Sequence, residues 1–390
     1  MIDHRNRVYI ILKFALLAAI GLATLGVAEL GARLVWKTLY NNWLEGQLHG
    51  SDELDRHRSL IIPQAGINQT VEEHRASLKN HGKTIGLAQF EDLVNELSLA
   101  DSTPILSISS LRFRGPEIVV PKPVGVFRIV TIGDSVTWGP PVDGTTYPAV
   151  MGKNLAPILI DRCEKKLEVV NAGVPGYNFE RVLKRIDEYL AVEPDLVTVY
   201  LGWNRTIGRA DPRKNQRLYH RYALYRFYYH GIVNRDDTGL TTDYNTRTAF
   251  NSEDPALAGY SDYDFGEDIK GLNELVEAFR ARDIPVTLIT LAGLLDWRIT
   301  PDQRALEIAF PIASTQNLFA YPLLTRQFNE EIRQFARQRD LGLIDFEEYA
   351  YHEFEPRSDY YTDSVHMTIR GYAAFGRYLA DQLESRIDCD

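Results

Sequence analysis

The feature that most constrains the fold of this chain is a regular alternation of short buried apolar runs with amphipathic segments, beginning near Val124. Five runs have the length and composition of buried strands. They are Val126–Ile132, Leu167–Asn171, Leu196–Leu201, Ile284–Leu291 and Leu341–Ile344. Amphipathic helical stripes lie between them, at 179–190, 269–279 and 324–335. Strands that alternate with helices of this length predict an α/β fold with a parallel sheet covered on both faces.

The residues that follow the strands are the candidates for function, because sites in such folds lie at the carboxyl ends of the strands. The first run leads into a Gly-Asp-Ser turn, which exposes the Ser135 hydroxyl at a helix N-terminus, where negative charge is favoured. The second run ends at Gly173, whose backbone N–H can approach a ligand closely. The third ends before Asn204, whose side-chain amide can donate to an oxyanion. Taken singly, each is equally compatible with an ordinary turn.

A fourth candidate lies near the C-terminus, where Asp363 and His366 are three residues apart in one loop. At this spacing the carboxylate can turn back and accept a hydrogen bond from the imidazole. That bond would fix the tautomer, so that the other ring nitrogen faces a serine. The alternatives are two solvated loop residues, or a carboxylate that caps the following helix.

The order of these motifs resembles the SGNH (GDSL-type) hydrolase family. The resemblance covers residues 105–390 and rests on GDSVTWG, NAGVPGY, YLGWN and DSVHMTIRGY, in this order. LRFRGPEI and TTYPAVM are also similar to segments of membrane-anchored members. The resemblance implies a three-layer α/β/α, flavodoxin-like fold with a five-stranded parallel sheet.

The resemblance also implies roles for individual residues. Ser135 is the expected nucleophile, His366 the base and Asp363 the residue that orients the base. The implied oxyanion hole consists of the N–H groups of Ser135 and Gly173 and the side chain of Asn204. Neighbouring positions expected to contact the substrate are Asp134, Trp138, Trp203 and Arg205. No cofactor and no metal are expected, and there is no CxxC motif or His/Cys cluster at metal-ligand spacing.

The segment after Asn204 departs from the average character of the chain. Arg205 stands where many family members have an aspartate, which changes the charge facing the substrate but keeps the oxyanion donor. From Arg205 to Arg235 there are eight Lys or Arg residues against one acid, with aromatic residues between them, in a chain of net charge −10. An amphipathic lid, a surface for anionic lipid headgroups and a platform for glycans all fit this composition. The overall acidity excludes nucleic acid as the main partner.

The N-terminus carries the longest apolar run, Val8–Val27, which is long enough as a helix to span about 30 Å of bilayer core. Arg5, Arg7 and Lys13 place its start on the cytoplasmic side by the positive-inside rule. A single-pass transmembrane anchor is therefore predicted, with a cleaved signal peptide or a buried soluble helix as alternatives. With an anchor or a cleaved signal, the bulk of the chain is extracytoplasmic.

The predicted organisation has three parts. Residues 1–37 form the anchor, 38–104 a juxtamembrane segment with a helix near 84–99, and 105–390 the hydrolase domain, with the basic, aromatic insertion at 205–262. The two cysteines, Cys163 and Cys389, either form a disulfide or remain unrelated thiols.

The predicted function is hydrolysis of acyl esters by a membrane-anchored extracytoplasmic serine esterase. Its expected substrate is an acylated small molecule, a cell-envelope glycan or a lipid. An O-acyltransferase that uses the same triad is the main alternative, since water and a sugar hydroxyl can both accept the acyl group. A non-catalytic binding or scaffold protein of the same fold is the third.

Overall fold

The computed structural model describes residues 21, 24–33, 68–80, 84–208, 210, 250–312 and 315–387. Residues 24–33 are helical, and within them Arg33 Nε donates to Glu29 Oε1 at 2.8 Å. No helix in these described ranges is long and apolar enough to cross a bilayer. Most of the run Val8–Val27 lies outside them, so the anchor stays a prediction.

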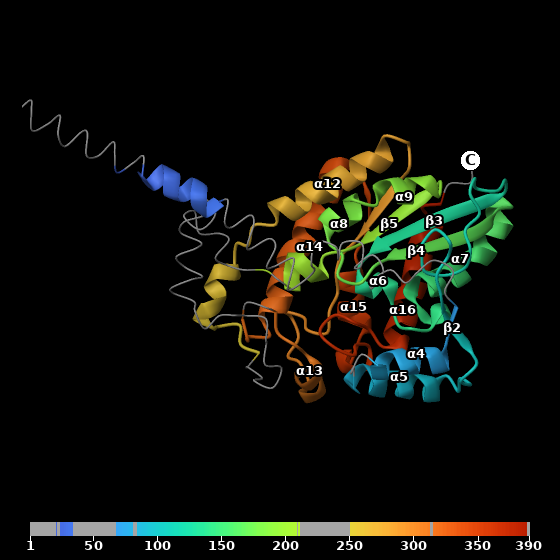
Figure 1. The fold of residues 1–390 in the computed structure, drawn as a ribbon, viewed down its shortest axis with the longest axis horizontal. Helices are drawn as coiled ribbons and strands as arrows, with labels where there is room; N and C mark the ends of the chain where they lie inside the picture. Colours follow the sequence, from blue (N-terminus) through green and yellow to red (C-terminus); the bar gives the residue numbers. More distant parts are fainter. Residues whose placement is uncertain are drawn as a thin grey trace, which may run out of the picture. The chain divides into compact units, whose positions relative to one another are not determined.

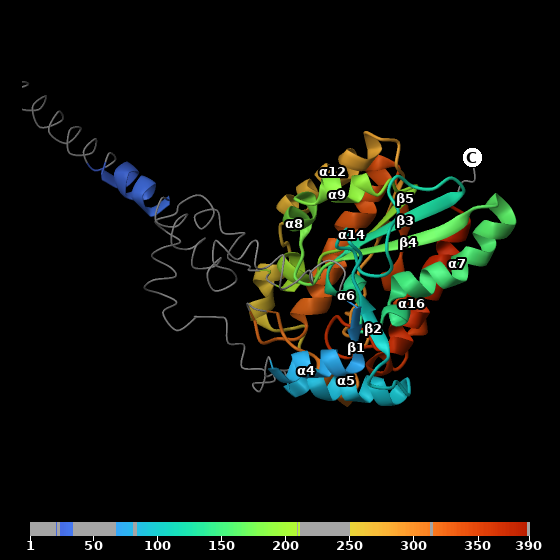
Figure 2. The same ribbon diagram turned by 45° about the vertical axis from the view of Figure 1, so that its right-hand side comes forward.

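A five-stranded parallel sheet forms the centre of the fold, in the order β4-β3-β5-β6-β7 (Figures 1 and 2). Its strands are β3 (Val126–Gly133), β4 (Lys166–Gly173), β5 (Leu196–Tyr200), β6 (Val286–Ile289) and β7 (Gly342–Ile344). The register pairs Gly133 with Gly173 on one side and with Tyr200 on the other. The carboxyl ends of the three strands β4, β3 and β5 are therefore level, and the predicted five-stranded parallel α/β fold is confirmed.

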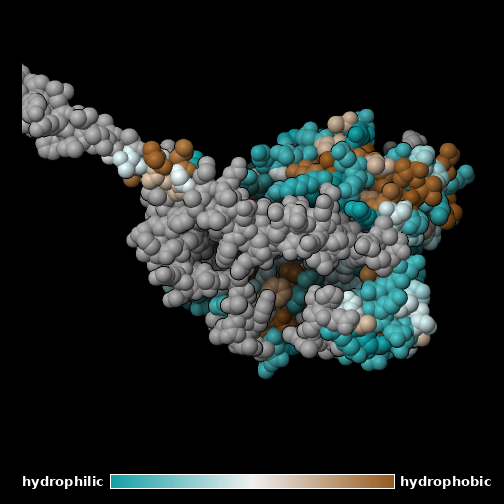
Figure 3. All heavy atoms as spheres, viewed as in Figure 1, coloured by the Kyte–Doolittle hydropathy of each residue, from teal (hydrophilic) through white to brown (hydrophobic). Residues whose placement is uncertain are grey.

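Helices cover both faces of the sheet (Figures 1 and 2). One layer contains α7 (Tyr147–Cys163), α15 (Phe346–Glu353) and α16 (Ile369–Glu384). The other contains α8 (Phe179–Leu183), α9 (Ile186–Ala191), α12 (Gly266–Arg280) and α14 (Ala320–Arg339). The outward faces of α12 and of α4 and α5 are hydrophilic (Figure 3), as the amphipathic pattern of α12 predicts.

The segment before residue 105 contains the helix predicted near 84–99, but it is more ordered than the predicted juxtamembrane segment. β1 (Asn68–Thr70) pairs antiparallel with β2 (Pro104–Ser107), and α4 (Val71–Asn80) and α5 (Thr84–Glu96) lie between them. Their apolar residues form a second core cluster, against which Trp138, Val142 and Ile369 pack. The predicted boundary at 104/105 is wrong, because it cuts through β2 and separates residues that share this core. The weak apolar periodicity of the segment concealed its packing.

Two further sequence features fall partly outside the described residues. The predicted insertion begins as a π-helix, Trp203–Gly208, and resumes before a 3₁₀-helix, Pro255–Tyr260. Residues 211–249, which hold most of the basic and aromatic stretch, are not among the described ones. Cys163, at the end of α7, is disulfide-bonded. Cys389, the other cysteine of the sequence, lies outside the described residues.

Candidate active site

Ser135 lies at the first position of a four-residue helix, α6 (Ser135–Trp138), directly after β3. The Asp134 carboxylate caps this helix by accepting from the N–H of Val136 at 3.1 Å. A Cβ atom at Gly133 would overlap the Thr137 side chain, so only glycine allows the strand to turn this sharply into the helix. The turn leaves the half-buried serine at the carboxyl edge of the sheet.

His366 lies within hydrogen-bond distance of both other predicted triad residues. His366 Nε2 is 2.8 Å from Ser135 Oγ, and His366 Nδ1 is 2.8 Å from Asp363 Oδ2. The other carboxylate oxygen, Asp363 Oδ1, accepts from the backbone N–H groups of Val365 and His366 at 2.9 and 2.7 Å. The loop therefore holds the carboxylate at one oxygen and leaves the second to orient the imidazole. The sequence predicted this juxtaposition across 231 residues of chain.

The charges of the triad favour a basic imidazole. Burial disfavours the imidazolium form of His366, but the hydrogen bond and charge of Asp363 outweigh this effect and raise the pKa of His366 above its usual value. Burial likewise opposes ionisation of Asp363, and the hydrogen bonds that it accepts keep its pKa below the usual range. Asp363 is therefore ionised at neutral pH and stabilises positive charge on His366.

The raised pKa of His366 predicts the pH dependence of ester hydrolysis. Only the neutral imidazole can take the serine proton, so kcat/KM should fall as the pH drops through a single pKa above 6.5 and reach a plateau at higher pH. A pH–rate profile with p-nitrophenyl acetate measures this pKa. A midpoint below the ordinary histidine value would contradict the arrangement.

The three predicted oxyanion donors lie at the ends of β3, β4 and β5, and the structure shows how each is engaged. No hydrogen bond among the described residues uses the N–H of Ser135. The N–H of Gly173 donates to Asn171 Oδ1 at 3.0 Å, and Asn204 Nδ2 donates to the carbonyl of Tyr177 at 3.0 Å. The second amide hydrogen of Asn204 leaves that side chain one further donor. Gly173 can bind an oxyanion only by sharing its N–H with Asn171.

The residues expected to contact substrate have different positions. Asp134 is fully buried, with Oδ1 on the Val136 N–H and Oδ2 3.3 Å from the N–H of Trp203. Burial raises the pKa of Asp134 to about 6. Trp203 is also buried, and its ring packs against Gly293 and Tyr321. The prediction of direct substrate contact is wrong for both, because they join β3 to the loop after β5. Trp138 is half-buried, and the side chain of Arg205 is not among those that the structure describes.

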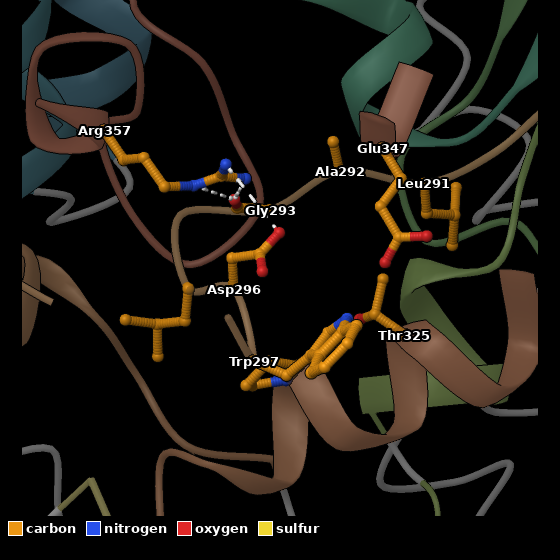
Figure 4. Close-up of a pocket in the computed structure, with 10 residues that line it drawn as sticks. Leu291, Ala292, Gly293, Asp296, Trp297, Thr325, Glu347 and Arg357 are labelled. Carbon is orange, nitrogen blue, oxygen red and sulfur yellow. Dashed lines mark hydrogen bonds and ion pairs between the residues drawn. The ribbon is translucent and has the colours of Figure 1, made fainter. Parts of the chain in front are cut away.

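A loop after β6 supports the histidine side of the triad. The N–H of Leu294 donates to the carbonyl of Ser364 at 3.0 Å, within the Asp363–His366 loop. Arg357 donates to the carbonyls of Gly293 and Leu294 and to that of Ala350. Figure 4 shows Arg357 reaching this loop at the edge of a small pocket that Trp297 and Glu347 also line.

The structure adds two residues to which the sequence motifs gave no role. Asn171, inside the NAGVPGY motif, bridges β4 to α6 by donating to the carbonyl of Thr137 at 2.9 Å. Arg114, inside LRFRGPEI, reaches the other end of α6. Both motifs were visible as parts of the resemblance, but only the fold shows what their side chains touch. Within the described ranges, no group of His, Cys, Asp and Glu residues is arranged to hold a metal ion.

A serine, a histidine and an aspartate joined in this order at the carboxyl edge of a parallel sheet define the class of the serine hydrolases. The model of the GDSL-like lipase/acylhydrolase family matches residues 131–374. The chain belongs to this family, and it is an ester-hydrolysing enzyme of the serine hydrolase type. Comparison with curated proteins gives no significant match.

Several solved structures are similar to the chain at low identity. An acetyl xylan esterase, AlAXEase, is 17% identical, with 67% of this chain and 100% of that chain covered and a TM-score of 0.40. The lipase/acylhydrolase from Enterococcus faecalis is 17% identical, with 68% and 98% covered and a TM-score of 0.37. The M. smegmatis aryl esterase is 15% identical, with 67% and 100% covered and a TM-score of 0.38. The activities in these names belong to those proteins.

Proposed function

We propose that this chain is a membrane-anchored, extracytoplasmic serine esterase that removes acyl groups from a cell-envelope glycan or lipid through an acyl-serine intermediate. The observation that carries the chemistry is the hydrogen-bonded chain from Ser135 Oγ through His366 to Asp363, with 2.8 Å at each link. The family supports ester hydrolysis in general. The substrate class and the location are the proposal.

The geometry supports a two-step mechanism. Ser135 Oγ attacks the ester carbonyl while His366 Nε2 takes the hydroxyl proton, and ionised Asp363 stabilises the imidazolium. The oxyanion forms beside the unused N–H of Ser135, at the N-terminus of α6. His366 then gives its proton to the leaving alcohol, and an acyl-serine remains. Water activated by the same histidine attacks the acyl carbonyl and releases the acid.

The proposed location follows from two observations. The run Val8–Val27, with basic residues at its start, has the length and the flanks of an anchor. Cys163 is disulfide-bonded, and disulfides persist mainly in oxidising, extracytoplasmic compartments. An alkaline phosphatase reporter fused after residue 390 should be active in cells, and the fusion should sediment with membranes. An inactive reporter would contradict the location while leaving the esterase assignment intact.

The reaction type is tested by product analysis. Purified protein should release free acid from p-nitrophenyl acetate at the same rate with and without an added oligosaccharide. Transfer of the acetyl group to the oligosaccharide, at the expense of free acetate, would instead identify an acyltransferase. In cells, the envelope component that gains acyl groups when Ser135 is replaced identifies the substrate. If no acylated component changes, the proposed substrate class is wrong.

A further inference from the structure

Arg114, from the LRFRGPEI motif, binds the carboxyl end of the helix that carries Ser135. Its side chain is almost entirely buried. Nη1 donates to the carbonyl of Trp138 at 2.5 Å and to that of Gly139 at 3.3 Å, while Nε donates to Asp143 Oδ1 at 2.9 Å. The guanidinium also lies over the Trp138 ring, 5.2 Å from its centroid. One side chain thus bonds the last residue of α6, the residue after it and a carboxylate.

A helix as short as α6 needs such external support. A single turn has too few internal hydrogen bonds to offset the entropy of ordering it, and its last carbonyls have no partner within the helix. A cation at this end satisfies these carbonyls and is stabilised by the partial negative charge that they carry.

Arg114 also connects α6 to the end of β4. Its backbone N–H donates to the carbonyl of Asn171 at 3.2 Å, and Asn171 Nδ2 donates to the carbonyl of Thr137 at 2.9 Å. A Cβ atom at Gly173 would overlap the backbone N of Trp138, so α6 and the glycine loop are already as close as their backbones allow. A shift of α6 would move the Ser135 N–H relative to the Gly173 N–H.

The orientation of the guanidinium is itself held from β2. Asp143 Oδ2 accepts from the N–H and the hydroxyl of Ser107, at 2.7 and 2.5 Å. The other carboxylate oxygen of Asp143 accepts from Arg114 Nε. Ser107 is the last residue of β2, so the carboxylate links this strand to the arginine.

We propose that Arg114 is a positioning residue for ester hydrolysis, which holds the nucleophile helix against the glycine loop so that their N–H groups face one oxyanion. This inference rests on the proposed role of Ser135 as nucleophile. Under this proposal, the segment from β1 to the LRFRGPEI motif helps to position the catalytic serine.

The test compares Arg114→Met with Arg128→Met. Arg128 is equally buried, donates to the carbonyls of Val119 and Val192, and pairs with Glu168 at 2.7 Å. It lies at the amino end of β3, roughly 20 Å from Ser135 at about 3.3 Å per strand residue. Both variants remove a buried cation from backbone carbonyls and from one carboxylate. Both variants should therefore lose thermal stability. Only Arg114→Met should also lose the position of the nucleophile helix.

For Arg114→Met we expect kcat with p-nitrophenyl acetate to fall by about 100-fold, with KM within about threefold, because the loss falls on the transition state. Arg128→Met should keep kcat within about threefold at a similar loss of thermal midpoint. Arg114→Lys, which retains the charge but lacks the fork of donors, should lose about 10-fold. If Arg114→Met does not fold, the lysine variant decides.

Two outcomes separate this inference from the proposed function. If wild-type protein reacts with a fluorophosphonate probe, and folded Arg114 variants react at the wild-type rate with unchanged kcat, the positioning role is wrong and the nucleophile assignment stands. If wild-type protein never reacts with the probe, the proposed function fails, whatever the Arg114 variants do.

Discussion

Replacing Ser135 by alanine should lower kcat for p-nitrophenyl acetate by at least about 10⁴-fold and abolish labelling by a fluorophosphonate probe. The reason is the geometry: Ser135 Oγ is 2.8 Å from His366 Nε2, at the N-terminus of α6. The hydroxyl makes no other hydrogen bond among the described residues, so its removal should leave the free energy of unfolding almost unchanged. Active-site labelling and circular dichroism on the same preparation measure both effects.

Ser358→Ala is the matched control for this experiment. Ser358 is buried, donates to Asp302 at 3.1 Å and has no hydrogen bond to a triad residue among the described residues. This variant should label and turn over like the wild-type protein. If Ser135→Ala still reacts with the probe, another residue is the nucleophile and the triad assignment is wrong.

The second large effect is expected at Asp363, where asparagine should be about as harmful as the loss of the histidine. Asp363 Oδ1 accepts two backbone N–H groups, so an asparagine must place its oxygen there and present its NH₂ group to His366 Nδ1. That nitrogen would then have to accept a hydrogen bond, which leaves the proton on Nε2, facing Ser135. A histidine in this tautomer cannot take the serine proton. We expect Asp363→Asn and His366→Ala each to lower kcat by about 10³- to 10⁴-fold.

Comparison with Asp363→Ala tests the tautomer argument directly. Alanine removes the orienting carboxylate but does not impose the wrong tautomer, so it should retain about tenfold more activity than asparagine. The ¹⁵N chemical shifts of the His366 ring nitrogens should show the proton on Nδ1 in the wild-type protein and on Nε2 in Asp363→Asn. Activity in Asp363→Asn equal to that of the wild-type protein would contradict the role of Asp363.

Ser135, His366 and Asp363 could be predicted from the sequence because each follows from a local rule. A serine in a glycine turn after an apolar run, and an aspartate three residues before a histidine, are visible as spacing. The parallel α/β fold then brings the strand ends to one edge of the sheet. The separation of 231 residues between Ser135 and His366 did not hide the pair, because sheet topology, rather than distance along the chain, decides which loops meet.

Asp134 and Trp203 were assigned wrongly for a physical reason. Their positions beside the motif residues suggested substrate contact, but neighbours on a tight turn point in different directions. Asp134 turns inward and binds the N–H groups of Val136 and Trp203, whereas Ser135 turns outward. Burial is a property of the packed chain, and the spacing of residues does not contain it.

The segment 68–104 is a second case in which packing decided what residue spacing did not show. Short strands such as β1, three residues long, give little pattern, so the sequence predicted a helix near 84–99 but not the strand pair β1 and β2 around it. The role of its apolar residues becomes visible only in the fold, where Trp138, Val142 and Ile369 pack against them.

The sequence by itself determined the alternation of strands and helices, the parallel sheet and the identity of the triad, because these depend on periodicity and on residue types at strand ends. Only the tertiary structure decided which polar side chains face the reaction and which hold the backbone. Arg114 and Asp143 are 29 residues apart, and no local pattern relates them. They meet because the second core cluster, built from residues 71–108, packs against Trp138 of α6. Long-range packing of this kind is fixed by the whole set of buried contacts.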